Sequence, residues 1–335
     1  MSLRFGRQMV AIPGPSVIPD RVLAAMARPM PDLYAGEILD VSAEVVEQLP
    51  GIARTDGQAF IVTANGHGAW DMAITNTLSA GDRVLVLESG RFATIWGEYA
   101  GITGVEPEVL PGDPRGAVDP TALEARLRED QQREIKAILF AHTDTATSVR
   151  NDIPALRAAI DAADHPALLM ADCIASMACD RFEMDEWGVD VALTGCQKGL
   201  MVPPGVAFVW ANDRALAAHR HAGLRVGYFD WTRRMRAGPI YDYYAGTPPI
   251  AHLYGLREAF ALIDEEGGIE AVWHRHQVLA DAVRAAVDAW SAPGNLELNI
   301  VAPDARSNAV TTVLTGDVDV DALRAHCADD AGLTV

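Results

Sequence analysis

The sequence predicts an α/β protein, with a large domain built on a mostly parallel sheet and a smaller α+β domain at the C-terminal end. Short apolar runs alternate with helical patterns along the first 250 residues, and this alternation favours a parallel sheet. Several runs are apolar throughout, which is typical of strands in a sheet that helices cover on both faces. The pattern of apolar residues changes near residue 250, where long helical patterns begin.

Seven strands are predicted in the first part of the chain, at residues 59–63, 84–87, 105–110, 137–141, 167–171, 189–194 and 206–210. Amphipathic patterns predict helices between them at residues 68–78, 92–102, 120–128 and 153–162. The second part predicts helices at 252–264, 269–290 and 320–327, and strands at 296–301 and 309–314.

These elements divide the chain into a large domain of residues 21–250 and a small domain of residues 251–335, preceded by an arm of residues 1–20. Residues 332–335 resemble the middle of another strand, so we expect the small domain to be incomplete. With 335 residues and 50% hydrophobic composition, the chain can bury a large core and support a second domain.

Composition excludes several classes of partner. The formal net charge is −19, which argues against nucleic acid, because its phosphates need clustered cations. No uncharged apolar run is long enough to span a membrane, and residues 1–9 lack the apolar core of a secretory signal. We therefore expect neither a nucleic-acid nor a membrane partner.

The four cysteines are Cys173, Cys179, Cys196 and Cys327. They form no CxxC pair, and no His/Cys cluster has the spacing of a zinc site, so we predict no metal. Such spacing suggests reduced thiols in a cytoplasmic protein.

Lys198 and Asp172 carry the strongest chemical signal. Lys198 follows the predicted strand 189–194 in a loop that continues into Pro203-Pro204-Gly205, and Asp172 ends the preceding strand. A lysine amine can form a Schiff base with the aldehyde of pyridoxal phosphate, and a carboxylate can pair with the ring nitrogen. The pair therefore predicts a site for this cofactor.

A phosphate-bearing cofactor also needs an anion site, which the start of a helix supplies. Asn65 and Gly66 stand between a predicted strand and a helix, with His67 next to them. Asn65 can cap the helix, and Gly66 allows close approach of the phosphate. A plain strand-to-helix turn explains the same residues, and so does an incomplete dinucleotide fingerprint, in which Asp71 takes the place of the third glycine.

Two other predicted strand ends carry residues that suit the cofactor. Phe92 follows the strand 84–87 and could stack on a flat ring, although core packing explains it equally well. Residues 142–148 follow the strand 137–141 and contain several hydroxyls, which could bond the ring or merely cap a turn. Ligands in open α/β sheets bind at the carboxyl ends of strands, so these residues predict one crevice.

In these stretches the sequence resembles the class V branch of the fold-type I pyridoxal-phosphate aminotransferases, above all the serine–glyoxylate and alanine–glyoxylate enzymes. The stretches that carry the resemblance are residues 13–16, 65–67, 142–149, 172–176, 186–190, 195–205 and 244–248, in the order that the family has them.

The resemblance implies a role for each matching position. Lys198 would form the Schiff base and shuttle the proton, and Asp172 would pair with the ring nitrogen. The phosphate would be held by Asn65, Gly66, His67 and Gln197. Phe92 would stack on the ring and Thr145 would bond near its hydroxyl. Tyr244 and Thr247 would reach the phosphate of a neighbouring subunit, which implies a homodimer with shared sites, in which the arm contributes to the site and the interface.

Two sites near the substrate are also implied. The Gly14 loop would line the pocket for the substrate carboxylate. Residues 31–36, with Tyr34, replace a His-Arg-Ser type segment of the family near the substrate. Ser148 stands where the family usually has glycine, and the late Arg-Ile-Gly-His stretch that holds the family's main carboxylate-binding arginine does not occur in this sequence.

The predicted function is transamination between a small amino acid, such as serine or alanine, and a small 2-keto acid, glyoxylate or pyruvate. Three alternatives stay open. A class V lyase, resembling a cysteine desulfurase or kynureninase, would use the same cofactor. A nucleotide-binding oxidoreductase would use the turn at residues 65–70 instead, and a binding protein without activity could share the scaffold.

Overall fold

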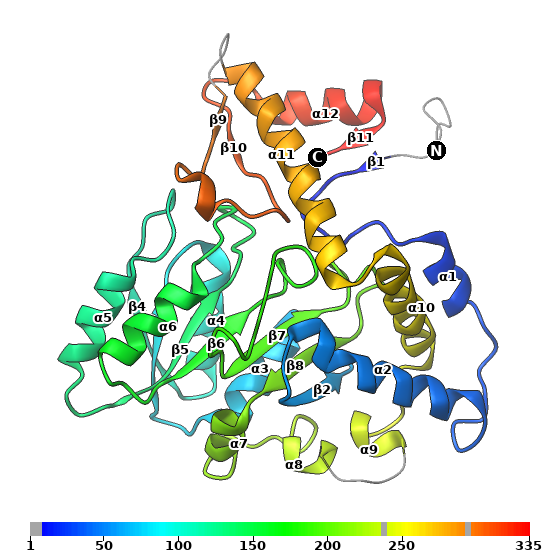
Figure 1. The fold of residues 1–335 in the computed structure, drawn as a ribbon, viewed down its shortest axis with the longest axis vertical. Helices are drawn as coiled ribbons and strands as arrows, with labels where there is room; N and C mark the ends of the chain where they lie inside the picture. The colour runs from blue at the N-terminus through cyan, green and yellow to red at the C-terminus, as the bar shows by residue number, and fades with distance from the viewer. Residues whose placement is uncertain (1–8, 236–239, 292–295) are drawn as a thin grey trace.

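A seven-stranded sheet forms the centre of the computed structural model, which describes residues 9–235, 240–291 and 296–335 (Figure 1). In spatial order its strands are β2 (Gln58–Val62), β8 (Ala207–Ala211), β7 (Val191–Gly195), β6 (Leu168–Asp172), β5 (Ile135–Ala141), β3 (Arg83–Leu87) and β4 (Glu106–Leu110). Neighbours from β7 to β4 are parallel, and β8 runs antiparallel to both β7 and β2. The predicted mostly parallel sheet is confirmed, and each predicted strand overlaps an observed one.

Helices cover both faces of this sheet. Successive residues of β3 enter different hydrophobic clusters, with Leu85 and Leu87 in one and Val84 and Val86 in the other, as the pleat of a strand requires. The first cluster includes side chains of α2 (Glu37–Ala53), α5 (Pro120–Glu129), α6 (Ile153–Ala162) and α10 (Ile250–Glu266). The second includes side chains of α3 (Gly66–Thr77), α4 (Arg91–Ile102) and α7 (Asp213–His219). The expectation of a doubly covered sheet is therefore correct.

Polar caps explain where several of these helices begin. The side chains of Asn65, Asp119, Asp152 and Asn212 each accept a hydrogen bond from a backbone amide in the first turn of the helix that follows. Such caps satisfy amides that have no acceptor inside the helix.

Several helices were not anticipated from the sequence. They are α1 (Asp20–Met26), α2, α7, α8 (Trp231–Arg234) and α9 (Ile240–Tyr244). The longest of these, α2, contains Pro50 inside its last turn and is held by packing against α10 and β2. Its place is therefore set by tertiary contacts more than by local sequence signals.

The second part of the chain is built on α11 (Ile269–Ser291), the long helix that rises above the sheet in Figure 1. Around it lie β9 (Glu297–Leu298), β10 (Val313–Leu314), a short 3₁₀ turn (Pro303–Ala305), α12 (Val320–Ala331) and β11 (Leu333–Thr334). The strand β11 pairs in parallel with β1 (Met9–Val10), so the N-terminal arm lies beside the small domain.

The strands β9 and β10 are shorter than the sequence predicts. Residues between them bond instead to loops of the large domain: Asn299 donates to Pro114 O and Thr147 O, and Ser307 donates to the buried carboxylate of Asp180. The polar side chains of this segment therefore bond to the first part of the chain, and β9 and β10 do not continue as a longer strand pair.

The division into an arm, a large domain and a small domain stays a prediction, and residues 1–8 of the arm lie outside the described residues. Among the helices of the described ranges, none combines the length and the apolar character that crossing a membrane requires.

Candidate active site

Asp172 and Lys198 lie at the carboxyl edge of the sheet, at the ends of the neighbouring strands β6 and β7. Asp172 is the last residue of β6 and pairs with Ala141 of β5 and Leu193 of β7. Lys198 follows the end of β7 in a loop that is closed by hydrogen bonds from Cys196 N to Val206 O and from Val202 N to Cys196 O. The register of adjacent strands therefore brings the two functional groups together from separate loops.

Asp172 is almost fully buried, with 4% of its surface exposed. One carboxylate oxygen accepts a hydrogen bond from Trp70 Nε1 at 2.9 Å, and the other accepts one from Ile174 N at 2.7 Å. Burial raises the pKa of Asp172 to about 7, although these hydrogen bonds and the charge of Lys198 oppose the rise. A cation placed beside this carboxyl would stabilise its ionised form.

The amine of Lys198 is held against the N-terminal arm. Its Nζ donates to Pro13 O, and Ser16 bonds back through its backbone N to Gln197 O (2.9 Å) and through Oγ to Lys198 O (2.9 Å). Burial lowers the pKa of Lys198, and the negative charge of Asp172 opposes this shift. A lowered pKa increases the fraction of neutral amine, which is the form that attacks a carbonyl or accepts a proton.

Gly14 is required by this contact. A Cβ built on Gly14 would lie 2.4 Å from Lys198 Nζ, and its φ of +104° falls in the region that favours glycine. The arm can therefore approach the amine only because residue 14 has no side chain.

A cavity of about 240 Å³ opens beside Lys198. Ile12, Pro13, Gly14, Ser16, Val17, Ala175, Cys179, Lys198, Gly199, Met201, Arg275, His276, Ala309 and Val310 line it. Asp172 is not part of this lining. Both the arm and α11 contribute to its wall.

The predicted phosphate turn lies at the start of α3. Asn65 caps the helix by accepting from Gly68 N, and Gly66 is packed so closely under Ile174 that a Cβ would lie 2.2 Å from its Cδ1. The first amides of a helix have no acceptor within it and suit an anion. His67 packs edge-on against Trp70, with 4.4 Å between ring centroids.

Gln197 precedes Lys198, and its Oε1 is a buried acceptor with no partner. Rotating the side-chain amide of Gln197 by half a turn exchanges its oxygen and its nitrogen. The buried group without a partner would then be an N–H donor. An unpaired donor at this position suits a phosphate, so Gln197 and the start of α3 fit the anionic end of the cofactor.

Phe92 is anchored by a carboxylate that the sequence did not single out. Asp144, which is fully buried, accepts from Phe92 N at 2.7 Å and from Ala146 N at 2.9 Å. It therefore joins the start of α4 to the turn that carries Thr145. Ser148, at the end of the same turn, has a φ of +63°, the left-handed conformation in which glycine is favoured.

Three predicted residues lie away from Lys198. Tyr34 is 74% exposed and lines a separate groove beside α2 and α9. Thr247 is exposed at the surface. Tyr244 is 1% exposed and its hydroxyl bonds to Ser42 Oγ of the same chain at 2.8 Å. In this arrangement the Tyr244 hydroxyl is enclosed in its own chain, which conflicts with the predicted contact to a neighbouring subunit.

Sequence reasoning missed several residues of the site. Trp70 lies three residues after His67 on α3, so helical spacing could have placed it near the turn. Arg275 and His276 line the cavity from α11, far from Lys198 in sequence, and no local pattern predicts this. His274, by contrast, is exposed.

A buried carboxylate at the end of one strand and a lysine amine in the loop after the next, beside an anion-binding helix start, define an enzyme of the pyridoxal-phosphate class with an α/β fold. The residues fit this cofactor, because Gln197 offers an unpaired polar group and Asp172 is poised to ionise beside a cation.

Comparison with known families gives a consistent result. The profile of the family "Aminotransferase class-V" matches residues 32–335, and the chain therefore belongs to this family. It is a pyridoxal-phosphate-dependent aminotransferase.

The chain is similar to the serine–glyoxylate aminotransferase of Methylorubrum extorquens, with 39% identity over 327 residues, covering 96% of this chain and 80% of that protein. It is also 38% identical to the L-aspartate–glyoxylate aminotransferase of Paracoccus denitrificans over 307 residues, or 91% of this chain and 76% of that one. Among solved structures, the ureidoglycine–glyoxylate aminotransferase of Bacillus subtilis matches with a TM-score of 0.85 at 25% identity, covering 100% of this chain and 84% of that one.

Proposed function

We propose that this aminotransferase moves the amino group of a small amino acid, such as serine or alanine, to glyoxylate or pyruvate. The observation that supports this most directly is the cavity of about 240 Å³ beside Lys198, which is sized for a small substrate. The names of its relatives support the same substrate class, since they are glyoxylate aminotransferases that take serine or aspartate.

Each residue of the site has a chemical part in this proposal. The cofactor supplies an aldehyde and a ring that takes up electrons from the substrate. Lys198 would hold it covalently and, as a neutral amine, would move a proton to and from the substrate. Asp172 would hold a proton on the ring nitrogen. The phosphate would be held by Asn65, Gly66, His67 and Gln197, while Phe92 would cover the ring and Thr145 would bond near its hydroxyl.

A half-reaction screen tests the proposal. The protein loaded with pyridoxal phosphate is mixed with single amino acids, without any keto acid, and the absorbance of the bound cofactor is followed. Serine and alanine should each convert it within one turnover, and added glyoxylate should restore the original spectrum. Glycine, aspartate and pyridoxamine define the limits of the donor range. A protein that binds the cofactor but reacts with none of these compounds would contradict the proposal.

The same experiment tests the lyase alternative. A lyase would release sulfide or alanine when cysteine is added without a keto acid. The structure disfavours a desulfurase. Such an enzyme needs a reactive cysteine on a mobile loop, whereas Cys173, Cys179 and Cys196 are buried. Burial raises the pKa of Cys179, the thiol that lines the cavity, to about 12, so it stays protonated.

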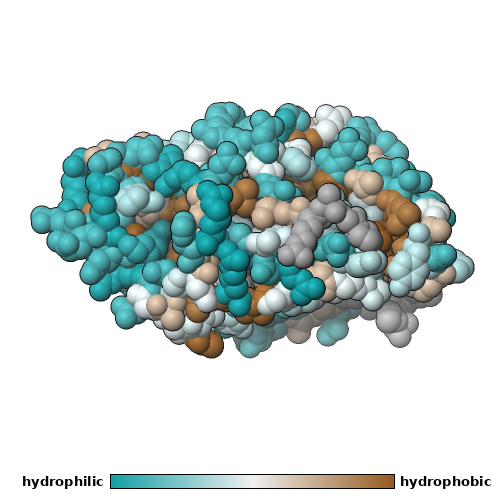
Figure 2. Space-filling view, turned by 90° about the horizontal axis from the view of Figure 1, so that it is seen from below, coloured by the Kyte–Doolittle hydropathy of each residue, from teal (hydrophilic) through white to brown (hydrophobic). Residues whose placement is uncertain are grey.

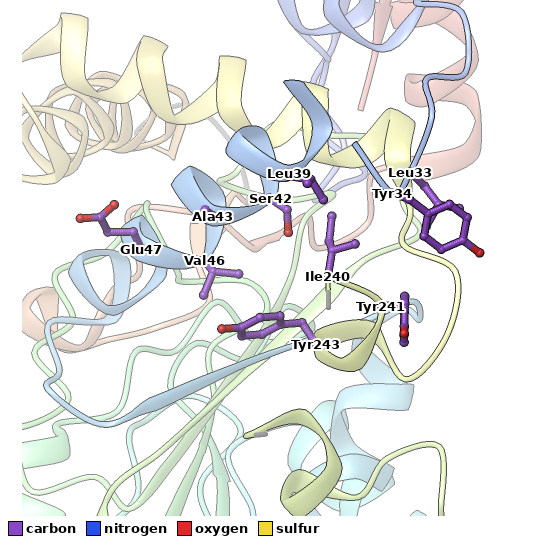
Figure 3. A pocket seen from close by; sticks show the side chains of 10 residues that line it. All are labelled: Leu33, Tyr34, Leu39, Ser42, Ala43, Val46, Glu47, Ile240, Tyr241 and Tyr243. Carbon is purple, nitrogen blue, oxygen red and sulfur yellow. The ribbon is translucent and has the colours of Figure 1, made fainter. Parts of the chain in front are cut away.

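We also propose a homodimer in which each subunit completes the site of the other. A groove of about 490 Å³ lies between α2 and α9, lined by Leu33, Tyr34, Leu39, Ser42, Ala43, Val46, Glu47, Ile240, Tyr241 and Tyr243. Figure 3 shows Leu39 and Ile240 pointing toward one another across it, with Tyr34 at one end. An exposed apolar groove of this kind favours a protein partner.

The position of two predicted residues supports this arrangement. Thr247 is exposed, and Tyr34 is 74% exposed and lies outside the cavity of its own Lys198, so each would act in the site of the partner. The face that carries α8 and α9 is mostly hydrophilic, with hydrophobic side chains showing between the polar ones (Figure 2). The role of Tyr244 toward the partner stays a prediction, and within its own chain its hydroxyl bonds to Ser42.

Leu39→Asp is expected to shift the protein from dimer to monomer, because a charge would be buried in the interface. Sedimentation velocity measures the change, and activity should fall with the dimer fraction. Ile102→Asp provides the matched control: Ile102 is 82% exposed on α4, outside the groove, and this variant should stay dimeric. A wild-type protein that is fully active as a monomer would contradict the shared site.

We further propose that the protein acts in the cytoplasm. The cysteines support this, because Cys173, Cys179, Cys196 and Cys327 are free thiols, as expected in a reducing compartment.

A further inference from the structure

We propose that Asp180 is a positioning residue of the substrate cavity: its carboxylate fixes residues 307–310 as one wall of that cavity and so limits the side chain that an amino donor can carry. Asp180 follows β6 in the chain, and residues 307–310 lie between the 3₁₀ turn and β10. The effect on the donor rests on the proposed function, whereas the placement of the wall does not.

Asp180 is a buried carboxylate that bonds directly to this segment. Its side chain is 0% exposed, so protein groups must stabilise its charge in place of water. Oδ2 accepts a hydrogen bond from Ser307 Oγ at 2.7 Å, and Oδ1 accepts one from Asn308 N at 2.8 Å. The carboxylate therefore holds two successive residues that follow it by 127 and 128 positions in the sequence.

The same carboxylate is anchored in the first part of the chain. Thr143 Oγ1 donates to Oδ2 at 3.1 Å, and Arg150 Nη1 lies 3.7 Å from Oδ1. Each oxygen is thus shared between the segment 307–310 and the turn at residues 142–150. Removing the charge of Asp180 would weaken both sides of this junction, because a hydrogen bond to an ionised group is stronger than one to a neutral group.

The backbone of the wall depends on Asp180 at two successive amides. The first is Asn308 N, which donates to the carboxylate itself. The second is Ala309 N, which donates to Ser307 Oγ at 3.0 Å, and this hydroxyl is in turn oriented by its bond to Asp180. The amide before them, Ser307 N, donates to Ser148 O at 3.1 Å.

On its other side the segment bonds to α11. Arg284 Nη2 donates to Ser307 O at 2.7 Å and to Asn308 Oδ1 at 3.0 Å, and Asn308 Nδ2 donates to Gln277 Oε1 at 3.0 Å. These bonds reach residues 307 and 308, whereas the bonds that start at Asp180 continue to Ala309 N. The residues that follow 308 are therefore placed from the side of Asp180.

Those residues form part of the cavity wall. Ala309 and Val310 line the cavity of about 240 Å³, and Asp180 lies close behind this lining. Burial and then the charge of Asp180 raise the pKa of Cys179 to about 12, and the same charge opposes the fall in the pKa of His276 that burial causes. Both of these residues line the cavity as well. A donor that enters the cavity must place its side chain in a space that Asp180 helps to bound.

Hydrogen exchange tests the placement of the wall without relying on activity. Asp180→Asn keeps the shape of the side chain, removes its charge and turns an N–H group toward groups that now donate. In the cofactor-loaded protein, the amides of Asn308 and Ala309 should exchange about tenfold faster than in wild type. The amide of Asn299, which donates to Thr312 O, should keep its rate. Mass spectrometry of peptides from the deuterated protein measures both.

The choice of donor tests the consequence for the substrate. Half-reaction kinetics are compared for alanine and for norvaline, whose side chain is a propyl group. In Asp180→Asn the ratio of kcat/KM for norvaline to that for alanine should rise roughly threefold to tenfold, because a wall that can move discriminates less against added methylene groups. Ser307→Ala removes the hydroxyl that links Asp180 to Ala309 N and should raise the same ratio, so it serves as a second variant if Asp180→Asn folds poorly.

Asn299→Ala is the matched control for a general loosening between the two parts of the chain. Asn299 is buried and donates to Pro114 O and Thr147 O, so it also joins the two parts, but it does not line the cavity. This variant should unfold at a lower urea concentration than wild type and keep the donor ratio of the wild type.

The outcomes separate this inference from the proposed function. Equal exchange of the Asn308 amide in wild type and Asp180→Asn would overturn the role of Asp180, and so would an unchanged donor ratio. An equal fall in rate with both donors, or the same rise of the ratio in Asn299→Ala, would reveal a general structural effect and also overturn it. If the wild type converts no amino acid, the proposed function fails, and the exchange experiment still decides whether Asp180 places the wall.

Discussion

Replacing Lys198 by alanine is expected to lower transamination by roughly 10⁴-fold or more, because the same amine anchors the cofactor and transfers the proton. The structure places this amine at the cavity, fixed between Pro13 O and the loop after β7. Neighbouring groups with the same reactivity are absent, since the chain has only two lysines, Lys136 and Lys198. Reduction of the loaded protein with borohydride, followed by mass spectrometry, measures the covalent attachment directly.

Lys136, the other lysine of the sequence, provides a control for the specificity of the covalent attachment. Lys136 lies on β5 with its side chain exposed, where its Nζ donates to Arg133 O. Lys136→Ala should keep full activity and one reducible adduct per chain, whereas Lys198→Ala should give none. Lys198→Arg should behave like the alanine variant, because it keeps the charge but not the nucleophile. An adduct that persists in Lys198→Ala would remove Lys198 from the site.

Replacing Asp172 by asparagine is expected to lower activity by about 10²–10³-fold, the usual effect of removing one preorganised electrostatic contact. The amide has nearly the same shape but cannot carry the charge that holds a proton on the ring nitrogen. It also turns an N–H group toward either Trp70 Nε1 or Ile174 N, which both donate to the carboxylate. Affinity for the cofactor, measured by fluorescence titration, should fall along with the rate.

The pH dependence of stability tests Asp172 separately from activity. Its pKa is about 7 in the folded protein, against 3.8 for an ordinary aspartate, so between these values the folded state holds a proton that the unfolded state has lost. The stability of the cofactor-free protein should therefore fall as pH rises from about 4 to 7. The loss due to this one group is roughly 2–4 kcal/mol and levels off above pH 7.

Urea unfolding of wild type and Asp172→Asn at pH 5 and pH 8 measures this contribution, because other titrating groups cancel in the difference. The wild type should lose stability relative to the variant on going to pH 8. Saturating pyridoxal phosphate should abolish the effect, since the ionised carboxylate then has a cationic partner. A difference that does not depend on pH would show that Asp172 is ionised throughout.

Much of the sheet could be predicted because its strands are continuous apolar runs that end at polar residues. The strands from β2 to β8 each overlap their predicted ranges, and the alternation of strand and helix indicated parallel pairing. The order of strands, with β8 antiparallel between β7 and β2, depends on contacts that no local pattern contains. The helix α2 was missed for the same reason.

The residues of the site also differ in how far the sequence predicts their position. Residues at the ends of adjacent strands, such as Asp172 and Lys198, could be predicted to converge, because parallel strands present their carboxyl ends at one edge. Trp70 bonds to Asp172 from α3, where helical spacing from His67 gives a partial signal, whereas nothing in the sequence around Asp144 predicts its bond to Phe92 N. Arg275 lines the cavity from α11, so its place depends on how the two parts of the chain pack.

The contact between Pro13 and Lys198 joins positions 185 residues apart. During synthesis, residues 12–16 leave the ribosome well before the loop that receives them has formed, so they have no binding partner until then. Closing so long a loop is slow and comes after local structure has formed. The catalytic amine is therefore enclosed only late in folding, and a chain that has built its sheet but not yet docked its first segment has a complete scaffold and no working centre.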